Sequence, residues 1–240
     1  MNNHSQSGLF PWVSLLTGAV SLPLRCWLLS SMENNGLLPR FHIAGIFSLL
    51  LFLLTAGICF WGLRQAPASY AYRRRFPPSR LAAAGTALGA VGIGISAFLV
   101  PAADILRILL PVLGILSAAA LIYTAHCRLI GLRPNCLSHG TMVLFLVFRI
   151  LTACQSWGAE PQVQFYLFPL LGSLCLLLAC YYRAETDAMT GDYRKYIFFG
   201  QTALFCCLMC LPGDDWLFYA SAAVWLATDY CVLPSRRRYG

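Results

Sequence analysis

The chain has 240 residues, of which 59% are hydrophobic and 11% are charged, and its formal net charge is +8. A soluble domain carries about 25% charged residues, so this chain has too little charge to cover a water-soluble surface, and we expect lipid to surround much of it. Strand-like alternation of apolar and polar residues is absent, which disfavours a membrane β-barrel and favours an all-α, polytopic membrane protein.

Apolar runs approach the roughly 20 residues that a helix needs to cross a bilayer, and they predict eight transmembrane helices. Prolines fall at or near the junctions between the runs. In chain order, we expect helices at residues 9–30, 41–63, 81–100, 104–126, 140–157, 163–182, 196–212 and 215–233. The first run has no preceding Lys or Arg and no following cleavage site, so we expect a retained helix and not a signal peptide.

The basic residues predict the orientation of the chain. Thirteen of the seventeen Lys and Arg residues fall on one side if the number of crossings is even, while several acidic residues fall on the other. Because cytoplasmic loops are rich in Lys and Arg, we predict a protein of the cell membrane with both termini inside. This rule explains the positive charge without a nucleic-acid partner. The cluster of Arg73, Arg74 and Arg75 is expected to contact anionic lipid headgroups.

Two similar stretches indicate an internal repeat. "SAAALIYTAHCRL" begins at Ser117, "SAAVWLATDYCVL" begins at Ser221, and six of their thirteen positions agree. Other landmarks recur in the same order, such as "GTAL" and "QTAL" in the third and seventh predicted helices. We predict a tandem duplication of a four-helix unit, with residues 1–134 and 135–240 as its halves in one membrane domain. Coincidence in a membrane composition is the alternative.

Charged residues inside apolar runs are the candidate binding residues. An arginine within hydrocarbon costs at least about 3 kcal/mol. Arg25 and Arg149 lie in the outer halves of the first and fifth predicted helices, and Arg107 opens the fourth. They predict either an anion-binding site between the halves or structural ion pairs with acidic residues. Asp229, near the inner end of the eighth helix, is either a proton-coupling acid or the partner of an arginine such as Arg128.

Small residues in the third and fourth helices predict close packing between these two neighbours. Gly85 and Gly89 form a GxxxG face in the third helix, and Gly114 lies in the fourth. Small residues let membrane helices approach each other where no hydrophobic effect drives association. We therefore expect a tightly packed helical hairpin, with a ligand slot as the alternative.

The eleven cysteines are interpreted mainly as small apolar residues, because most of them lie within apolar runs. Cys207 and Cys210 form a CxxC pair in "CLMC". A membrane thiol oxidase uses such a pair together with a second cysteine pair and a quinone. Since no compact second pair stands in an outer loop, thiol redox chemistry is kept only as a minor alternative.

The stretches "FRILTACQSWGAEPQ", "YYRAE" and "LFYASAAVWLAT", together with the earlier "LRCWLL" and "GLLP", resemble an uncharacterised family of small multi-pass membrane proteins from anaerobic Gram-positive bacteria. The resemblance covers most of the chain. It implies a membrane location and transfers no catalytic residue.

The motifs of common hydrolases, metalloproteases and nucleotide-binding enzymes are absent, so we predict no enzymatic activity, no metal and no cofactor. The leading hypothesis is an accessory, scaffold or assembly protein that binds a protein partner or a second copy of the chain. The alternatives are a small transporter or channel with an anion site at Arg25 and Arg149, and a thiol-redox protein that uses Cys207 and Cys210.

Overall fold

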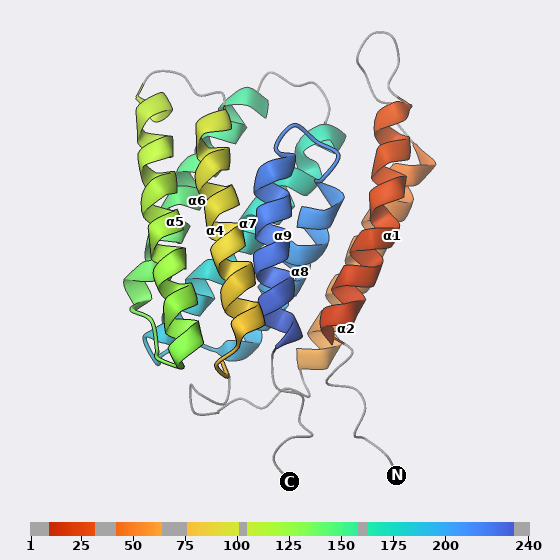
Figure 1. Cartoon of the computed structure of the whole chain (residues 1–240). Helices are drawn as coiled ribbons and strands as arrows, with labels where there is room; N and C mark the ends of the chain where they lie inside the picture. Colours follow the sequence, from red (N-terminus) through yellow and green to blue (C-terminus); the bar gives the residue numbers. More distant parts are fainter. Residues whose placement is uncertain (1–9, 32–41, 64–75, 101–104, 158–162, 233–240) are drawn as a thin grey trace, which may run out of the picture.

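The computed structural model describes residues 10–31, 42–63, 76–100, 105–157 and 163–232, and this part of the chain consists of helices and the turns between them (Figure 1). The eight expected helices are all present as helices. They are α1 (Phe10–Ser30), α2 (Ile43–Leu63), α4 (Arg80–Leu99), α5 (Leu106–Ile130), α6 (Cys136–Trp157), α7 (Val163–Asp187), α8 (Tyr193–Met209) and α9 (Trp216–Cys231).

Six of these helices, α1, α2, α4, α5, α6 and α7, are long and apolar enough to cross a membrane, which fits a membrane protein. The other two are shorter, with 17 residues in α8 and 16 in α9. The start of α1 and the end of α9 lie at the same end of the bundle (Figure 1). We call this the network end, because a network of buried charges lies there, and we call the other the opposite end.

Local sequence signals set several helix ends. Ser79 precedes α4, and its hydroxyl accepts a hydrogen bond from the backbone N–H of Ala82. Asp192 precedes α8 and accepts one from the N–H of Arg194 at 3.0 Å. Such side chains satisfy backbone donors that the first helical turn leaves without partners. Gly131 ends α5 with φ 70°, a left-handed conformation that glycine adopts without strain.

Six helices form a closed ring. Helices α4, α5, α6, α7, α8 and α9 each pack against the next in chain order, and α9 packs against α4 to close the ring. Helices α1 and α2 stand outside it, where they pack against each other and against α8 (Figure 1). Helix α8 contacts both of its neighbours in the ring and both outer helices, and α9 contacts α4, α8 and α1. These two helices are therefore enclosed by others.

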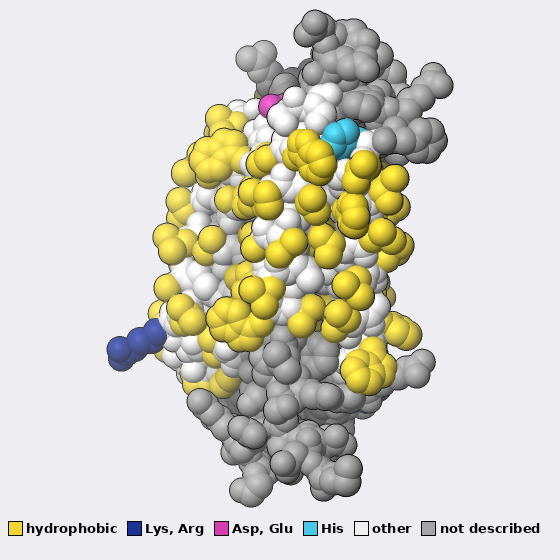
Figure 2. Space-filling view, turned by 90° about the vertical axis from the view of Figure 1, so that its right-hand side faces the viewer, with side chains coloured by type: hydrophobic (Ala, Val, Ile, Leu, Met, Phe, Trp, Pro, Cys, Tyr) yellow, Lys and Arg dark blue, Asp and Glu magenta, His cyan; other side chains and the backbone are white. Residues whose placement is uncertain are grey.

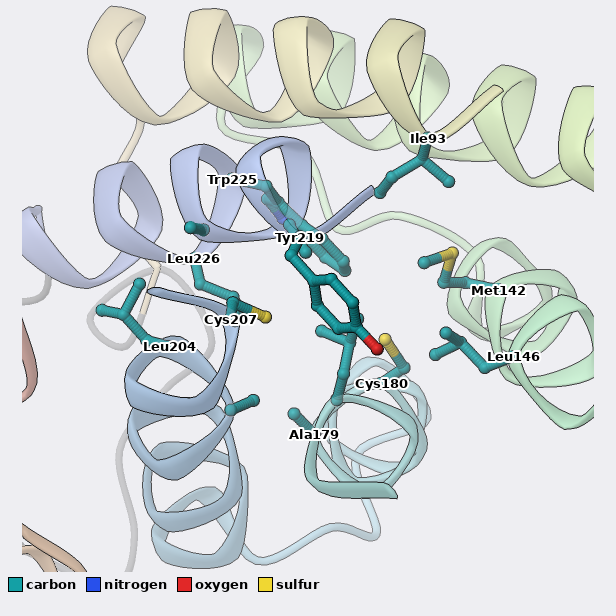
Figure 3. Packing of buried hydrophobic residues seen from close by; sticks show 14 of the residues in the cluster. Ile93, Met142, Leu146, Ala179, Cys180, Leu204, Cys207, Tyr219, Trp225 and Leu226 are labelled. Carbon is teal, nitrogen blue, oxygen red and sulfur yellow. The ribbon is translucent and has the colours of Figure 1, made fainter. Parts of the chain in front are cut away.

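The interior of the ring is filled by packed side chains. Figure 3 shows residues of α4, α6, α7, α8 and α9 converging on it, among them Ile93, Met142, Cys180, Leu204 and Trp225. All five are at most 4% exposed. Apolar packing of this kind supplies many small dispersion contacts.

The outside of the bundle is apolar. Exposed large side chains such as Leu16, Leu50, Leu88, Ile108 and Leu137 occur on α1, α2, α4, α5 and α6. Figure 2 shows hydrophobic side chains over the height of one face, with charged side chains only toward its two ends. Contiguous apolar surface of this extent marks a surface that contacts lipid or protein.

Four helices extend at least three residues farther at the network end than we predicted. Helix α5 ends at Ile130 and not at 126, α6 begins at Cys136 and not at 140, α7 ends at Asp187 and not at 182, and α8 begins at Tyr193 and not at 196. The extensions contain charged side chains, which the hydropathy pattern assigned to loops. The charges of Arg128, Arg183 and Asp187 are compensated within the bundle, so helices α5 and α7 continue through them.

The glycine-rich face of α4 packs against a different helix from the one predicted. A Cβ on Gly85 would overlap the side chain of Thr228, and a Cβ on Gly89 would lie 2.7 Å from the Cβ of Trp225. Both neighbours belong to α9, so these two glycines let α4 approach α9 and not α5. Gly114 does serve the predicted hairpin, because its Cβ would overlap Ala97 of α4.

The repeat of residues 1–134 and 135–240 stays a prediction of the sequence. Helices α6 to α9 pack as a continuous series, whereas α1 and α2 pack on α8 and stand apart from α4 and α5 (Figure 1). The principal contacts of the two halves among the described residues are therefore unequal. Arg73, Arg74 and Arg75, the expected lipid-headgroup cluster, lie outside the described residues.

Candidate functional site

Asp229 of α9 is the centre of a buried network of charges at the network end. Its carboxylate pairs with Arg128 of α5 (Nη2–Oδ1 2.6 Å) and with Arg183 of α7 (Nη1–Oδ2 3.5 Å). The hydroxyl of Tyr196 in α8 donates a hydrogen bond to Oδ2 at 2.6 Å. One carboxylate thus joins four helices of the ring, and Arg128 is one of the partners that we considered for it.

A second carboxylate extends the network to α6. Nε of Arg183 lies 3.5 Å from Oδ1 of Asp187, one helical turn later in α7. Nδ1 of His139 in α6 lies 2.8 Å from the other oxygen of Asp187. The imidazole ring also stacks on Trp225 of α9, with 6.3 Å between the centroids. His139 therefore connects α6 with both α7 and α9.

Phe76, in the segment before α4, covers the arginines. The guanidinium carbon of Arg183 lies 3.3 Å from the centroid of its ring, and that of Arg128 lies 5.0 Å away. The rings of Tyr193 and Tyr196 meet Phe76 edge-on at 5.4 and 5.9 Å. An aromatic face attracts a desolvated cation by about 2 kcal/mol, so Phe76 stabilises both arginines in this dry environment.

The buried ion network comprises Arg128, His139, Arg183, Asp187, Tyr196 and Asp229, all at most 5% exposed. Two arginines and two aspartates balance in charge when His139 is neutral. Removing one partner of such a buried pair typically costs about 3–5 kcal/mol, because the other charge is left without compensation. The network can therefore fasten five helices together and close the ring at one end.

Arg149 of α6 lies at the opposite end and is also paired. Its Nη2 lies 3.2 Å from Oδ1 of Asp215, the residue before α9, and its guanidinium carbon lies 3.9 Å from the centroid of Phe218. Tyr219 follows Phe218, and its hydroxyl donates to the carbonyl of Pro169 in α7 at 3.2 Å. The contacts of Arg149 thus join α6 to the start of α9.

Arg25 and Arg149 lie on different parts of the fold. Arg25 is buried in α1, outside the ring, and lies near Cys210 at the end of α8. Arg107 is the second residue of α5, and its side chain lies outside the described part. The pairing of Arg149 with Asp215 fits the structural reading, while a shared anion site of all three arginines stays a prediction.

The cysteines give no support to redox chemistry. All eleven fall within the described residues and are free thiols. Cys207 and Cys210 are 0% and 4% exposed, whereas a reactive thiol needs partial access and an electropositive surrounding. Among the described residues, no group of three His, Cys, Asp or Glu side chains is placed to hold a metal ion.

Four members of the network were not predicted from the sequence: His139, Arg183, Asp187 and Tyr196. His139, Arg183 and Asp187 lie beyond the ends of the predicted helices, where the hydropathy pattern predicts loops. Arg183 and Asp187 are four residues apart, which is the spacing of an ion pair on one helix face. That spacing in "YRAETD" was the one available sign that α7 continues through these charges.

The chain was also compared with known proteins. No family model, no curated protein and no solved structure matches it. The resemblance to small multi-pass membrane proteins therefore stays a prediction, and the function is argued from the geometry of the chain.

Proposed function

We propose that all eight helices cross the cell membrane and that both termini are cytoplasmic. Helices α8 and α9 are short, but eleven of the 17 residues of α8 and nine of the 16 of α9 are buried. A helix enclosed by other helices needs fewer apolar residues than one surrounded by lipid. Their place in the ring beside membrane-length helices supports this topology (Figure 1).

The distribution of charges supports the orientation. Among the described residues, six basic residues lie at the network end, and three, Arg25, Arg107 and Arg149, lie toward the opposite end. The six are Arg80, Arg128, Arg133, Arg183, Arg194 and Lys195. By the positive-inside rule the network end faces the cytoplasm. Exposed tryptophans lie near helix ends at both levels, with Trp12 and Trp61 at one and Trp27 and Trp216 at the other, as expected of residues at membrane interfaces.

We propose that the protein has no catalytic role and acts as an accessory or scaffold protein within the membrane. The observation that carries this proposal is the mutual pairing of the buried charges. Asp229 binds Arg128, Arg183 and Tyr196, and Arg149 binds Asp215. Each of these side chains pairs with a side chain of another element, and the pairs hold the helices to one another. A rigid bundle with a broad apolar surface suits a protein that positions membrane partners.

The role is tested by extracting the chain from its native membranes at natural abundance and measuring its mass by native mass spectrometry in a mild detergent. A scaffold or accessory protein is expected in an assembly heavier than one chain with bound lipid. Recovery of the chain alone in several detergents, with no partner captured even when the membranes are chemically cross-linked before extraction, would contradict the role.

An anion transporter or channel is the second candidate, and one observation favours it. Nη1 of Arg149 is buried without a hydrogen-bond partner among the described residues, while its counter-ion Asp215 has a side chain that is 42% exposed. An anion arriving from the opposite end would reach this buried donor beside the partly exposed Asp215. Such a site can form only if Asp215 moves aside.

Reconstituted vesicles distinguish the two candidates. The purified chain, Arg149→Gln and Asp192→Asn are inserted into liposomes, and the flux of chloride, phosphate and acetate is measured. We expect no protein-dependent flux from any of the three. Flux that disappears in Arg149→Gln and persists in Asp192→Asn would establish transport and contradict the scaffold role.

A further inference from the structure

The middle of α8 carries a buried side-chain amide that the ion network does not use. Gln201 is the ninth of the 17 residues of α8 and is 2% exposed. Within the described part of the chain, its Oε1 atom is buried and has no hydrogen-bond partner. A buried acceptor normally has a partner, because leaving it unpaired costs the free energy of its desolvation. The amide of Gln201 therefore needs a donor that the described side chains do not supply.

Two phenylalanines of α8 show that this amide lies beside α2. Phe198 and Phe205 lie three residues before and four residues after Gln201, so the three residues share one face of the helix. The centroid of the Phe198 ring lies 6.3 Å from that of Phe60 in α2, and the centroid of the Phe205 ring lies 6.0 Å from that of Phe52. Gln201 is therefore level with the stretch of α2 between Phe52 and Phe60.

Helix α1 lies on the other side of the amide. Leu208, seven residues after Gln201, is on the same face of α8, and a Cβ on Gly18 of α1 would overlap its side chain. On a helix with 3.6 residues per turn, the direction of Gln201 falls between that of Leu208 and those of Phe198 and Phe205. The amide therefore points into the junction where α1, α2 and α8 meet (Figure 1).

Four small polar side chains of α1 and α2 lie at the same level. Thr55 and Cys59 belong to that stretch of α2 and are 1% and 3% exposed. The hydroxyl of Thr55 lies 2.9 Å from that of Thr17 in α1, and the hydroxyl of Ser14 lies 3.8 Å from the sulfur of Cys59. We call these four residues, together with Gln201, the polar junction.

The polar junction has more acceptors than donors. The hydroxyl of Thr17 donates to the carbonyl of Val13 at 2.7 Å. The single hydroxyl hydrogen of Thr55 is within reach of the carbonyl of Leu51 at 2.7 Å and of Thr17. Each hydroxyl oxygen also has two lone pairs, and Oε1 of Gln201 adds a further acceptor. The chemistry of the junction therefore suits a small molecule that donates hydrogen bonds.

We propose that the polar junction binds one buried water molecule, which donates to Oε1 of Gln201 and to a hydroxyl oxygen of α1 or α2. Water is the smallest molecule with two donors, and buried waters typically make about three hydrogen bonds to polar groups that otherwise lack partners. An alkali cation fits less well, because the five residues of the junction include no carboxylate to compensate its charge. The water joins the outer pair of helices to the ring at mid-height of α8.

A crystal structure of the full chain, grown in a lipid mesophase and refined at a resolution that places ordered waters, tests the proposal directly. We expect a density peak within hydrogen-bond distance of Oε1 of Gln201 and of the hydroxyl oxygen of Thr55 or Ser14. Absence of a peak at this position would overturn the proposal. An anomalous signal at the peak after crystals are soaked in rubidium chloride would identify a cation site and would also overturn it.

Thermal denaturation in detergent gives an independent measurement. Gln201→Met replaces the amide by an apolar side chain of similar length. Thr202→Val is the matched control, because Thr202 is also buried in α8 and its hydroxyl bonds within the helix to the carbonyl of Phe198 at 2.8 Å. We expect a lower melting temperature for Gln201→Met than for the unmodified chain and Thr202→Val, because the amide loses its hydrogen bond to the water. An equal or higher melting temperature would show that the amide has no such partner, and the proposal would fail.

Discussion

The carboxylate of Asp229 connects α9 to three other helices of the ring. It accepts from Arg128, Arg183 and Tyr196, which lie on three different helices. A carboxylate in such a dry position is tolerated because two guanidinium groups compensate its charge. Its partners, in turn, depend on it, so the network is expected to fail as a unit when Asp229 is neutralised.

Asp229→Asn is expected to lower the free energy of unfolding by about 3 kcal/mol or more, because Arg128 and Arg183 lose the charge that compensates them. The measurement is thermal denaturation in detergent, monitored by the helical circular-dichroism signal. Asp192→Asn is the matched control, since Asp192 is exposed and Asn caps a helix about as well as Asp. Equal melting temperatures for the two variants would show that the network is not structural.

Arg128→Met and Asp229→Leu are expected to be less harmful together than the sum of their separate effects. Each single change leaves the buried ion network with one charge uncompensated, whereas the double change keeps the network balanced, with Arg183 paired to Asp187. Contacting residues of this kind show coupling energies of about 0.5–3 kcal/mol. Thermal denaturation of the two single variants and the double variant gives this coupling, and strict additivity would mean that the 2.6 Å contact contributes nothing.

Residues of the candidate site were predictable when their charge interrupted an apolar run. Arg25, Arg149 and Asp229 stood out for that reason. His139 and Arg183 did not, because they lie beyond the apolar runs and their burial depends on helices far away in the chain. Tyr196 gave no signal either, since a tyrosine near a helix end is ordinary and its hydrogen bond to Asp229 exists only in the folded ring.

Among the helices, the existence of each was predictable and the partners of each were not. The apolar runs predicted all eight helices, because the hydropathy and the length of a run can be read directly from the sequence. The contact of α4 with α9 joins elements more than a hundred residues apart. Gly85 and Gly89 signalled that some helix approaches closely, but a small residue does not specify which one.

Gly89→Ala is expected to destabilise the bundle by about 1–3 kcal/mol, because its Cβ would lie 2.7 Å from the Cβ of Trp225 and 2.8 Å from the carbonyl oxygen of Ser221. Gly57→Ala is the control in α2, where nothing lies within 4 Å of the added carbon. That variant is expected to gain roughly 0.5–1 kcal/mol from helix propensity. Opposite shifts in melting temperature support the α4–α9 contact, and a neutral Gly89→Ala would argue against it.

For the bundle as a whole, the ring of α4 to α9 places the paired charges near its two ends and apolar packing between them. Membrane proteins rarely keep charges at mid-depth, where compensation is most costly. The buried ion network lies within about one turn of the helix ends, and Arg149, farther inside α6, pairs with Asp215 at the start of α9. This division follows from the solvent, since water and headgroups are near only at the two membrane surfaces.

The closed ring was beyond sequence reasoning. Hydropathy orders the crossings along the chain, yet the packing of α9 against α4, and of α1 and α2 outside the ring, depends on side-chain shapes across the molecule. The predicted repeat of residues 1–134 and 135–240 is a claim about duplication of an ancestral sequence. The unequal packing of the two halves neither supports nor contradicts a duplication.

The topology of α8 and α9 decides between eight crossings and fewer. Epitope tags are inserted into the full chain at Thr190, at Gly213 and after the last residue, and antibody access is compared in intact and permeabilised cells. We expect the tag at Gly213 to be accessible from outside, and the tags at Thr190 and at the C-terminus only after permeabilisation. Detection of the Gly213 tag and the C-terminal tag on the same side would contradict the eight-crossing ring.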